Sequence, residues 1–252
     1  LLKELHAILM DSVRGRNKSP GEFRRVQNYI GPPGCSLEEA TFVPPCAEYL
    51  DSSLDNWEKY LHYDEKDHLV QLAIVKAQFE LIHPFLDGNG RIGRMLVPIF
   101  LFSKGILSRP MFYLSAYLES NREEYYRHLQ AISEAGDWDG WIQFFLMAVL
   151  NQAKINIAKT QAILALYERM KKEVPEMTHS QYAITAIDAM FDAPIFQRSM
   201  FINRSGIPRE SALRILKQFQ QNGIIQMIRR GQGRRGSIFA FEELINITEQ
   251  EI

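Results

Sequence analysis

The stretch HPFLDGNGRIGR, from His83 to Arg94, concentrates the reactive groups of this chain in twelve residues. It contains an imidazole, a carboxylate, two glycines on either side of an asparagine, and two arginines. Such a set is suited to holding a polyphosphate and attacking it. The segments on either side have the spacing of amphipathic helices, so the chemistry is predicted to lie in this stretch.

The two glycines beside Asn89 predict an anion-binding loop. Gly88 and Gly90 let the backbone adopt positive φ and approach a ligand closely, and they stand where a helix is about to begin. The first amides of a helix have no internal acceptor, and the helix dipole favours an anion beside them. The side-chain amide of Asn89 could add one more donor.

The charged groups of the stretch fit the same kind of ligand. Arg91 and Arg94 are three residues apart, so they share a helix face and can reach further phosphates through forked hydrogen bonds. The carboxylate of Asp87 would repel a phosphate unless a cation lay between them, and Mg²⁺ is the usual bridge. His83 titrates near neutrality, so it can accept a proton from an attacking hydroxyl.

Two other nucleotide-binding patterns do not fit. Gly88, Gly90 and Gly93 have the spacing of the dinucleotide fingerprint, but that pattern follows a strand of a βαβ unit, and here a helix is predicted to precede it. The Gly-Lys-Ser/Thr sequence of a P-loop does not occur in the chain. Neither a Rossmann fold nor a P-loop fold is therefore expected.

Hydrophobic spacing predicts a mainly α protein around this loop, with helices at residues 1–13, 50–61, 68–81, 91–104, 121–135 and 138–172. Ala40 to Val43 is a short β-prone run ended by Pro44 and Pro45, and it predicts a small β-hairpin flap. Because the chain starts with helical spacing and not with Met, we expect that an N-terminal part is missing.

The last part of the chain has a different pattern. The boundary is predicted at residues 174–176, so residues 1–174 would form a catalytic core with a linker helix and residues 175–252 a second domain. There, helices near 180–190, 196–203 and 210–220 precede strands near 224–228 and 237–241. This is the order of a winged helix-turn-helix domain.

Composition excludes several classes of protein. The net charge of −1, with 46% hydrophobic and 23% charged residues, is ordinary for a globular protein and gives the whole molecule no attraction to membranes or nucleic acid. No apolar stretch is long enough to span a bilayer and no signal peptide is visible, so a cytoplasmic location is expected. Cys35 and Cys46 lack a metal or redox spacing and are expected to be unpaired thiols.

Positive charge gathers locally near the C-terminus. Between Arg204 and Arg235 there are eight basic residues and one acidic residue, Glu210. On a winged helix these groups could meet DNA phosphates, with Arg230 to Arg235 on the backbone. Many such folds instead act as protein-docking or dimerisation modules, so contact with DNA and a homodimer are both left open.

The chain resembles the Fic family. His83 to Arg94 agrees at every fixed position with the family motif His-x-Phe-x-Asp/Glu-Gly-Asn-Gly-Arg-x-x-Arg. The likeness covers roughly residues 1–150 and includes GEFR (21–24), ATFVPP (40–45), AQFE (77–80), LSAY (114–117) and YY (125–126). The resemblance implies a Fic-type helical bundle.

The resemblance also implies an activity, namely transfer of AMP from ATP to a Ser, Thr or Tyr hydroxyl of a target protein, with release of pyrophosphate. By likeness, His83 is the general base and Asp87 holds Mg²⁺. The phosphates would be held by Gly88, Asn89, Gly90, Arg91 and Arg94, with Arg91 at the β-phosphate and Arg94 at the γ-phosphate. Tyr125 and Tyr126 would border the nucleotide. The flap would hold the target segment by strand addition, through Thr41, Phe42, Val43 and Pro44.

Simpler interpretations stand beside these roles. Asp87 could cap the following helix, Arg91 and Arg94 could form surface ion pairs, and Tyr125 and Tyr126 could be core aromatics. A different function is also open, a DNA-binding regulator whose core senses nucleotide or modifies itself. Phosphate transfer is disfavoured, because Fic relatives that perform it have Lys in place of Gly90.

Many Fic proteins carry an inhibitory helix whose Glu is followed by Gly or Asn and pairs with the second motif arginine, here Arg94. No Glu of this chain is followed by Gly or Asn. We therefore expect that the chain is active without relief of inhibition, or that another segment or chain supplies the inhibitory Glu.

Overall fold

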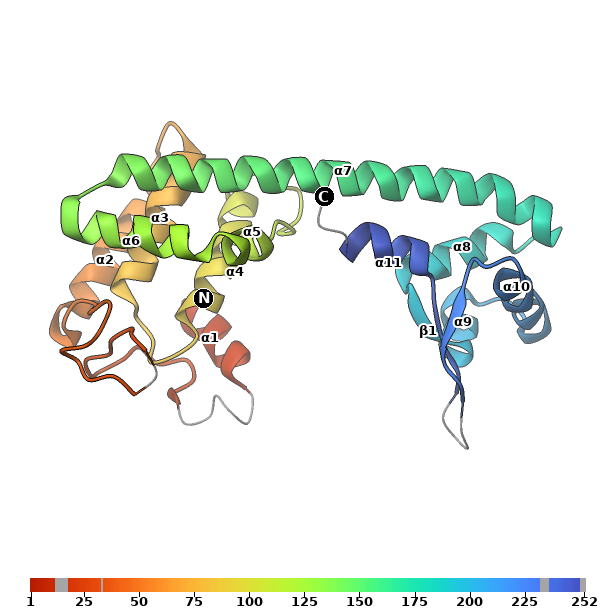
Figure 1. Ribbon diagram of the computed structural model, residues 1–252, viewed down its shortest axis with the longest axis horizontal. Helices are drawn as coiled ribbons and strands as arrows, with labels where there is room; N and C mark the ends of the chain where they lie inside the picture. Colours follow the sequence, from red (N-terminus) through yellow and green to blue (C-terminus); the bar gives the residue numbers. More distant parts are fainter. Residues whose placement is uncertain (12–17, 33, 232–235, 250–252) are drawn as a thin grey trace. The chain divides into compact units, whose positions relative to one another are not determined.

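The computed structural model describes residues 1–11, 18–32, 34–231 and 236–249 (Figure 1). The chain forms two compact units, Leu1–Gln152 and Ala153–Ile252, and the division falls within one helix, α7 (Trp138–Thr178). The boundary predicted at residues 174–176 lies inside the same helix. Pro175 removes one main-chain hydrogen bond there without ending the helix, and Thr178 Oγ1 donates to the Val174 carbonyl at 2.7 Å.

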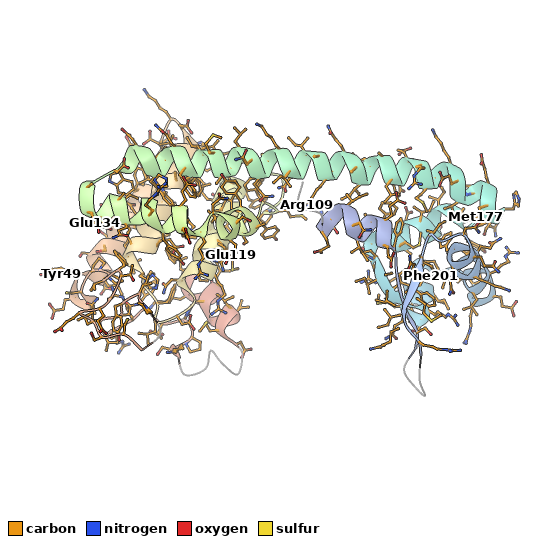
Figure 2. The ribbon with its side chains drawn as sticks, in the orientation of Figure 1. Tyr49, Arg109, Glu119, Glu134, Met177 and Phe201 are labelled. Carbon is orange, nitrogen blue, oxygen red and sulfur yellow. The ribbon has the colours of Figure 1, made fainter. Side chains whose placement is uncertain are left out.

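The unit Leu1–Gln152 is built from helices around the neighbouring pair α3 (His68–Ile82) and α4 (Asn89–Ser103). Around them lie α1 (Leu2–Met10), the 3₁₀ turn η2 (Ala47–Tyr49), α2 (Leu50–Leu61), α5 (Ser115–Ser120) and α6 (Arg122–Ala135). A core between α2, α3, α4 and the loop, against which α1 packs, contains Leu50, Trp57, Val75, Phe79, Ile82, Phe85, Ile92 and Leu96. In Figure 2 the side chains are added, with Tyr49 at the end of η2 and Glu134 near the end of α6. The predicted mainly α architecture is confirmed.

The ends of α3 and α4 create the loop that carries the reactive groups. The Asp67 carboxylate caps α3 by accepting hydrogen bonds from the amides of Leu69 and Val70. His83 directly follows the last residue of α3 as its C-cap and has a left-handed backbone with φ of 49°. α4 begins after Gly88, also left-handed with φ of 82°. The loop between the two helices therefore starts at the imidazole and ends at a helix N-terminus.

The predicted β-hairpin flap is reduced to a single bridge. Ile30 and Phe42 exchange two main-chain hydrogen bonds, with N–O distances of 2.9 and 3.0 Å. Prolines at positions 32, 44 and 45 have no amide hydrogen, so a β ladder cannot continue through them.

The unit Ala153–Ile252 combines helices with a small antiparallel sheet (Figure 1). Its elements after α7 are α8 (Ala183–Asp192), β1 (Ile195–Gln197), α9 (Arg198–Ser205), α10 (Arg209–Gln221), β2 (Gln226–Arg229), β3 (Ile238–Ala240) and α11 (Glu242–Glu249). The strands lie in the order β1-β3-β2, with both pairs antiparallel. The predicted succession of helices, turn, helix and hairpin is present. β1 and α11 were not predicted. β1 has three residues, which is too short to show an alternating pattern.

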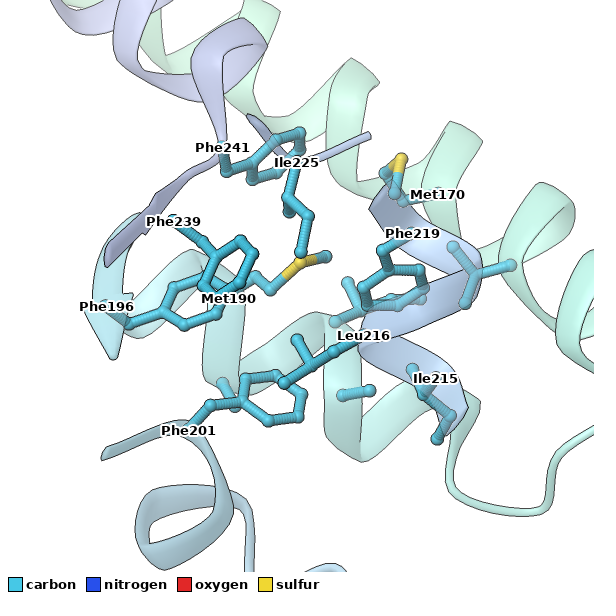
Figure 3. Close-up of a cluster of buried hydrophobic side chains, with 14 of the residues drawn as sticks. Met170, Met190, Phe196, Phe201, Ile215, Leu216, Phe219, Ile225, Phe239 and Phe241 are labelled. Carbon is cyan, nitrogen blue, oxygen red and sulfur yellow. The ribbon is translucent and has the colours of Figure 1, made fainter. Parts of the chain in front are cut away.

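Aromatic side chains fill the core of this second unit (Figure 3). Phe196 of β1 and Phe239 of β3 stack with ring centroids 6.2 Å apart, and Phe196 also contacts Phe201 of α9. α9 and α10 meet through Gly206, whose φ is 65°, followed by the buried Ile207. Because one side of each helix is committed to this core, the opposite side of α10 is left exposed.

Three further predictions concern the chain as a whole. No helix in the described part of the chain is long and apolar enough to cross a membrane. Cys35 and Cys46 are both free thiols, as predicted. The first helix ends at Met10, whereas the predicted helix reached Val13, which lies outside the described residues.

Candidate active site

His83 has a neutral imidazole with one nitrogen available as a proton acceptor. Its Nδ1 lies 3.3 Å from the main-chain oxygen of Glu80. A carbonyl oxygen only accepts hydrogen bonds, so Nδ1 carries the proton and Nε2 does not. Burial lowers the pKa of His83, while the nearby Glu80 acts in the opposite direction. The side chain is therefore unprotonated at neutral pH.

The main chain of the loop is held by two side chains that precede the flap. The guanidinium of Arg24 is 3% exposed and donates to a set of carbonyl oxygens, those of Val26, Pro45, Ile82 and His83. Asn28 donates from Nδ2 to the carbonyl of Phe85 at 3.0 Å. Sequence reasoning noted Arg24 only within GEFR and missed Asn28, because a hydrogen bond to a distant carbonyl leaves no local pattern.

Asn89 braces the loop from inside. Its side chain is 1% exposed, and Oδ1 accepts a hydrogen bond from the Phe85 amide at 2.9 Å while Nδ2 donates to the Phe85 carbonyl at 2.7 Å. The side chain is thus committed to the loop backbone, which corrects its predicted role as a donor to phosphate. What Asn89 offers an anion is its main-chain amide, at the first position of α4.

His6 supports the other side of the loop and was also missed from the sequence. Its ring stacks on Phe85 with centroids 3.9 Å apart, and both side chains are fully buried. Nδ1 accepts a hydrogen bond from the Gly21 amide at 2.8 Å, so Nε2 carries the proton and donates to the Asp87 carbonyl at 3.0 Å. Burial lowers the pKa of His6, which keeps it in this neutral form.

The start of α4 has the features of an anion-binding site. Gly88 has positive φ, and a Cβ there would lie 3.3 Å from Met10 Sδ and 3.4 Å from the His6 ring, so only glycine fits without strain. The first intrahelical bond is donated by the Ile92 amide to the Gly88 carbonyl. The amides of Asn89, Gly90 and Arg91 precede that bond and have no acceptor within the helix, so they can bind phosphate oxygens.

Three charged side chains stand at the same helix start. Asp87 has a half-exposed carboxylate whose Oδ1 accepts from the Gly88 amide at 2.5 Å and lies 3.7 Å from Arg91 Nη2. It does not cap α4, because its hydrogen bond goes to the N-cap residue itself. Arg94 is exposed, and its Nη1 lies 3.5 Å from the place where a Cβ on Gly90 would be. Within the described residues Arg94 has no ion-pair partner, unlike Arg91.

The Asp87 carboxylate can serve Mg²⁺ only as part of a shared coordination shell. No group of three or more His, Cys, Asp and Glu side chains able to hold a metal occurs among the described residues. Mg²⁺ is commonly held by one or two carboxylates, with substrate phosphates and water filling its octahedral shell. One carboxylate beside an anion-binding helix start fits that manner of binding.

The two adjacent tyrosines have different surroundings. Tyr125 is partly buried, and its hydroxyl accepts a hydrogen bond from Lys76 Nζ at 3.0 Å, while desolvation raises its pKa well above the usual value. Tyr125 also packs against Trp141, so it belongs to the core. Tyr126 is 49% exposed and lines a hollow of about 350 Å³ together with Thr41 and Phe42 of the flap. Of the pair, Tyr126 is the one placed to border a ligand.

A buried ion pair lies between α3 and α4, the two helices that flank the loop. Lys76, 1% exposed, pairs with Glu80 one helical turn further along α3. Gly93 of α4 faces this pair, and a Cβ on Gly93 would collide with the Glu80 carboxylate. The charged pair therefore sets how closely α4 approaches α3. The sequence signal for it is the i, i+4 spacing of opposite charges, which usually marks a solvated helix face.

The flap leaves one edge of its backbone unpaired. Phe42 uses both its amide and its carbonyl in the bridge to Ile30. In extended backbone, alternate residues direct their polar groups to opposite sides. Thr41 and Val43 flank Phe42 and are exposed, and among the described residues their main-chain groups have no hydrogen-bond partner. The buried Pro44 follows and its carbonyl accepts a hydrogen bond from Gln27.

Comparison with known proteins agrees with this arrangement of loop and helices. Residues 1–101 match the model of the Fic/DOC family. The protein adenylyltransferase Fic of Drosophila grimshawi is 30% identical over 128 residues, which cover 49% of this chain and 23% of that protein. The protein adenylyltransferase Fic of Culex quinquefasciatus is 31% identical over 151 residues, covering 57% of this chain and 26% of that protein. The chain therefore carries a Fic/DOC family domain.

A solved structure shares the fold over nearly the whole chain. A Fic family protein from Desulfovibrio desulfuricans G20 superposes with a TM-score of 0.57 at 19% identity, covering 95% of this chain and 67% of that one. At this identity the likeness concerns the fold alone. The chain spans about a quarter of the length of the curated relatives that it matches.

Proposed function

We propose that the chain is a protein adenylyltransferase, which transfers AMP from ATP to a Ser, Thr or Tyr hydroxyl of a target protein. The observation that carries this proposal is the position of His83. Its neutral imidazole has Nε2 free to accept a proton, and His83 is the first residue of the loop that ends at the unpaired amides of α4. General base and phosphate site are thus six residues apart on one braced loop.

The reaction follows from these groups. The triphosphate lies at the start of α4, where the amides of Gly90 and Arg91 donate to phosphate oxygens and Arg94 reaches the terminal phosphate. The target hydroxyl oxygen forms a bond to the α-phosphorus as its proton moves to His83 Nε2. The bond from the α-phosphorus to the bridging oxygen breaks, and pyrophosphate leaves with that electron pair. Fixed amides and guanidinium groups stabilise the charge that builds on the phosphate oxygens.

Asp87 is the residue that would hold Mg²⁺ in this site. The ion supplies neutralisation of the phosphate charge when bound. Asp87 already contacts Gly88 and Arg91, so its carboxylate is fixed beside the amides that bind the phosphates.

The surroundings of the loop suit the other parts of the substrates. The hollow lined by Tyr126, Phe42 and Thr41 has an apolar character suited to the base of the nucleotide. A target segment can add to the free edge of the flap through the main-chain groups of Thr41 and Val43, in the manner of strand addition. A cytoplasmic location, which gives access to ATP, and a homodimer belong to the same proposal and remain predictions.

Labelled ATP tests the proposal against its rivals. The chain is incubated with Mg²⁺ and either α-labelled or γ-labelled ATP, with proteins of a cell extract and its own hydroxyls as acceptors. AMP transfer leaves the α label on protein and releases labelled pyrophosphate from γ-labelled ATP. Protein labelled from the γ position would show phosphate transfer, and ATP that stays intact while bound would favour a nucleotide-sensing regulator.

A further inference from the structure

Some basic residues of the second unit have acidic partners and others do not. Arg169, Lys171 and Arg204 each have an acidic partner, respectively Glu243, Glu168 and Asp192. By contrast, five basic residues of α10 and the β2–β3 hairpin have no ion-pair partner in the described part of the chain: Arg209, Arg214, Lys217, Arg229 and Arg230. Exposed cations without an acidic partner in the fold are available to an external anion.

α10 carries three of these cations on its exposed surface. Its buried side consists of Ala212, Ile215, Leu216 and Phe219. Arg209, Leu213 and Lys217 follow each other at intervals of four residues and are all exposed, so they form one stripe along the helix. From Arg209 to Lys217 the stripe is about 12 Å long, at 1.5 Å per residue.

A hollow places the hairpin on the same side as this stripe. It measures about 570 Å³, and its lining includes Arg198 and Asn203 of α9, Arg209 and Leu213 of α10, and Gly231 and Ser237 of the hairpin. No carboxylate is among its described lining residues. The Arg198 guanidinium lies 5.3 Å from the centre of the Phe239 ring, a cation–π contact that holds one cation of the lining in place. The hollow therefore connects the start of α10 with the hairpin, and together they make one continuous basic face.

We propose that this face, formed by α10, the hairpin and the hollow between them, binds double-stranded DNA. The major groove of B-DNA is about 12 Å wide and admits an α-helix, so the stripe on α10 can enter it. Leu213, 36% exposed in the middle of the stripe, suits an apolar contact with a thymine methyl group. The phosphates on either side of the groove suit five cations: Arg209 and Lys217 at the two ends of the stripe, Arg214 of α10, and Arg229 and Arg230 on the hairpin.

The geometry selects DNA over duplex RNA. The major groove of an A-form RNA helix is deep and narrow, and side chains of a helix cannot read it. The inference is independent of AMP transfer, since no residue of the loop from His83 to Arg94 takes part in it.

The test measures how binding of the whole chain to a 20-base-pair DNA duplex depends on salt, by fluorescence anisotropy. Five neutralised phosphates give a slope of log K against log salt of about −4.5, which is a loss of about 500-fold between 50 and 200 mM salt. Lys217→Ala removes one phosphate contact and should make the slope shallower by about 0.9. Circular dichroism checks that the exposed substitution leaves the fold intact.

Lys171→Ala is the matched control, because it also removes one lysine from the second unit but from an ion pair on α7. It should leave both affinity and slope unchanged. The proposal is overturned by absence of binding at 50 mM salt, by equal effects of Lys171→Ala and Lys217→Ala, or by equal affinity for an RNA duplex of the same sequence. Binding of a poly-glutamate peptide as tight as that of DNA would likewise overturn it and assign the face to an acidic protein.

Discussion

Replacing Asn89 with alanine removes the brace inside the phosphate-binding loop, and its effect can be worked out bond by bond. The Phe85 amide loses its acceptor, Asn89 Oδ1, and leaving a buried donor unsatisfied costs about 1–3 kcal/mol. The Phe85 carbonyl loses Asn89 Nδ2 but keeps Asn28 Nδ2 at 3.0 Å, so this second loss is about 0.5–1.5 kcal/mol. The free energy of unfolding should therefore fall by about 1.5–4.5 kcal/mol.

In Asn89→Ala, kcat/KM for AMP transfer should fall by more than the loss of folded protein explains. A displacement of about 1 Å in groups that position a substrate can lower the rate about 100-fold, and the loop carries both His83 and the first amides of α4. Stability is followed in urea by tryptophan fluorescence, since all three tryptophans lie in the unit Leu1–Gln152. kcat/KM for AMP transfer is measured on the same preparations.

Asn222→Ala is the control for this prediction. Asn222 also donates from its amide to a carbonyl, that of Gln218, but it is exposed at the end of α10. Its replacement should leave kcat/KM and the tryptophan transition unchanged. If Asn89→Ala behaved like Asn222→Ala in both assays, the bracing role assigned to Asn89 would be refuted.

Other expected outcomes follow from single groups. Because burial lowers the pKa of His83, kcat/KM should hold as pH falls through 6.5, the ordinary imidazole value, and decline only below it; a decline centred above 6.5 would contradict this. The unfolded chain binds a proton at His83 that the folded chain does not, so the free energy of unfolding should also drop below about pH 6.5 in urea titrations. Lys76→Met leaves the Glu80 carboxylate without its buried partner and should destabilise the first unit by about 3–5 kcal/mol in the same urea assay, whereas replacing both residues with apolar ones should restore most of the loss. Val43→Pro deletes a main-chain donor from the free edge of the flap, so KM for a protein acceptor should rise. Hydrolysis of ATP to AMP and pyrophosphate, in which water replaces the protein acceptor, should be unchanged. Equal effects on both reactions would exclude docking at this edge.

The parts of the fold that follow from local pattern could be predicted from the sequence. The helix at Leu50–Leu61 agrees with its predicted limits, and the one at His68–Ile82 differs by one residue, because apolar spacing and the Asp67 cap mark them locally. The start of α4 follows from Gly88, which alone tolerates the backbone required there. These local signals place the imidazole and the anion site at the two ends of one loop.

What escaped the sequence depends on contacts between distant segments. His6 and Arg24 hold the loop from 81 and 59 residues away, through main-chain carbonyls that carry no information about their partner. Tyr125 and Tyr126 are neighbours in sequence and their ring centroids are 5.3 Å apart, yet Tyr125 packs against Trp141 while Tyr126 is 49% exposed and borders a hollow. Asn89 was assigned to phosphate because an amide can donate to an anion or to a carbonyl, and only packing decides between them.

The measurement that tests the central claim most directly compares His83→Ala with wild type in ATP binding and in turnover. His83 is assigned to proton transfer and not to holding the triphosphate. His83→Ala should therefore bind Mg²⁺–ATP within about twofold of wild type while AMP transfer falls by about 10²–10⁴-fold. The exposed His62→Ala, in the same unit, should leave both unchanged. AMP transfer by His83→Ala at the wild-type rate would contradict the account.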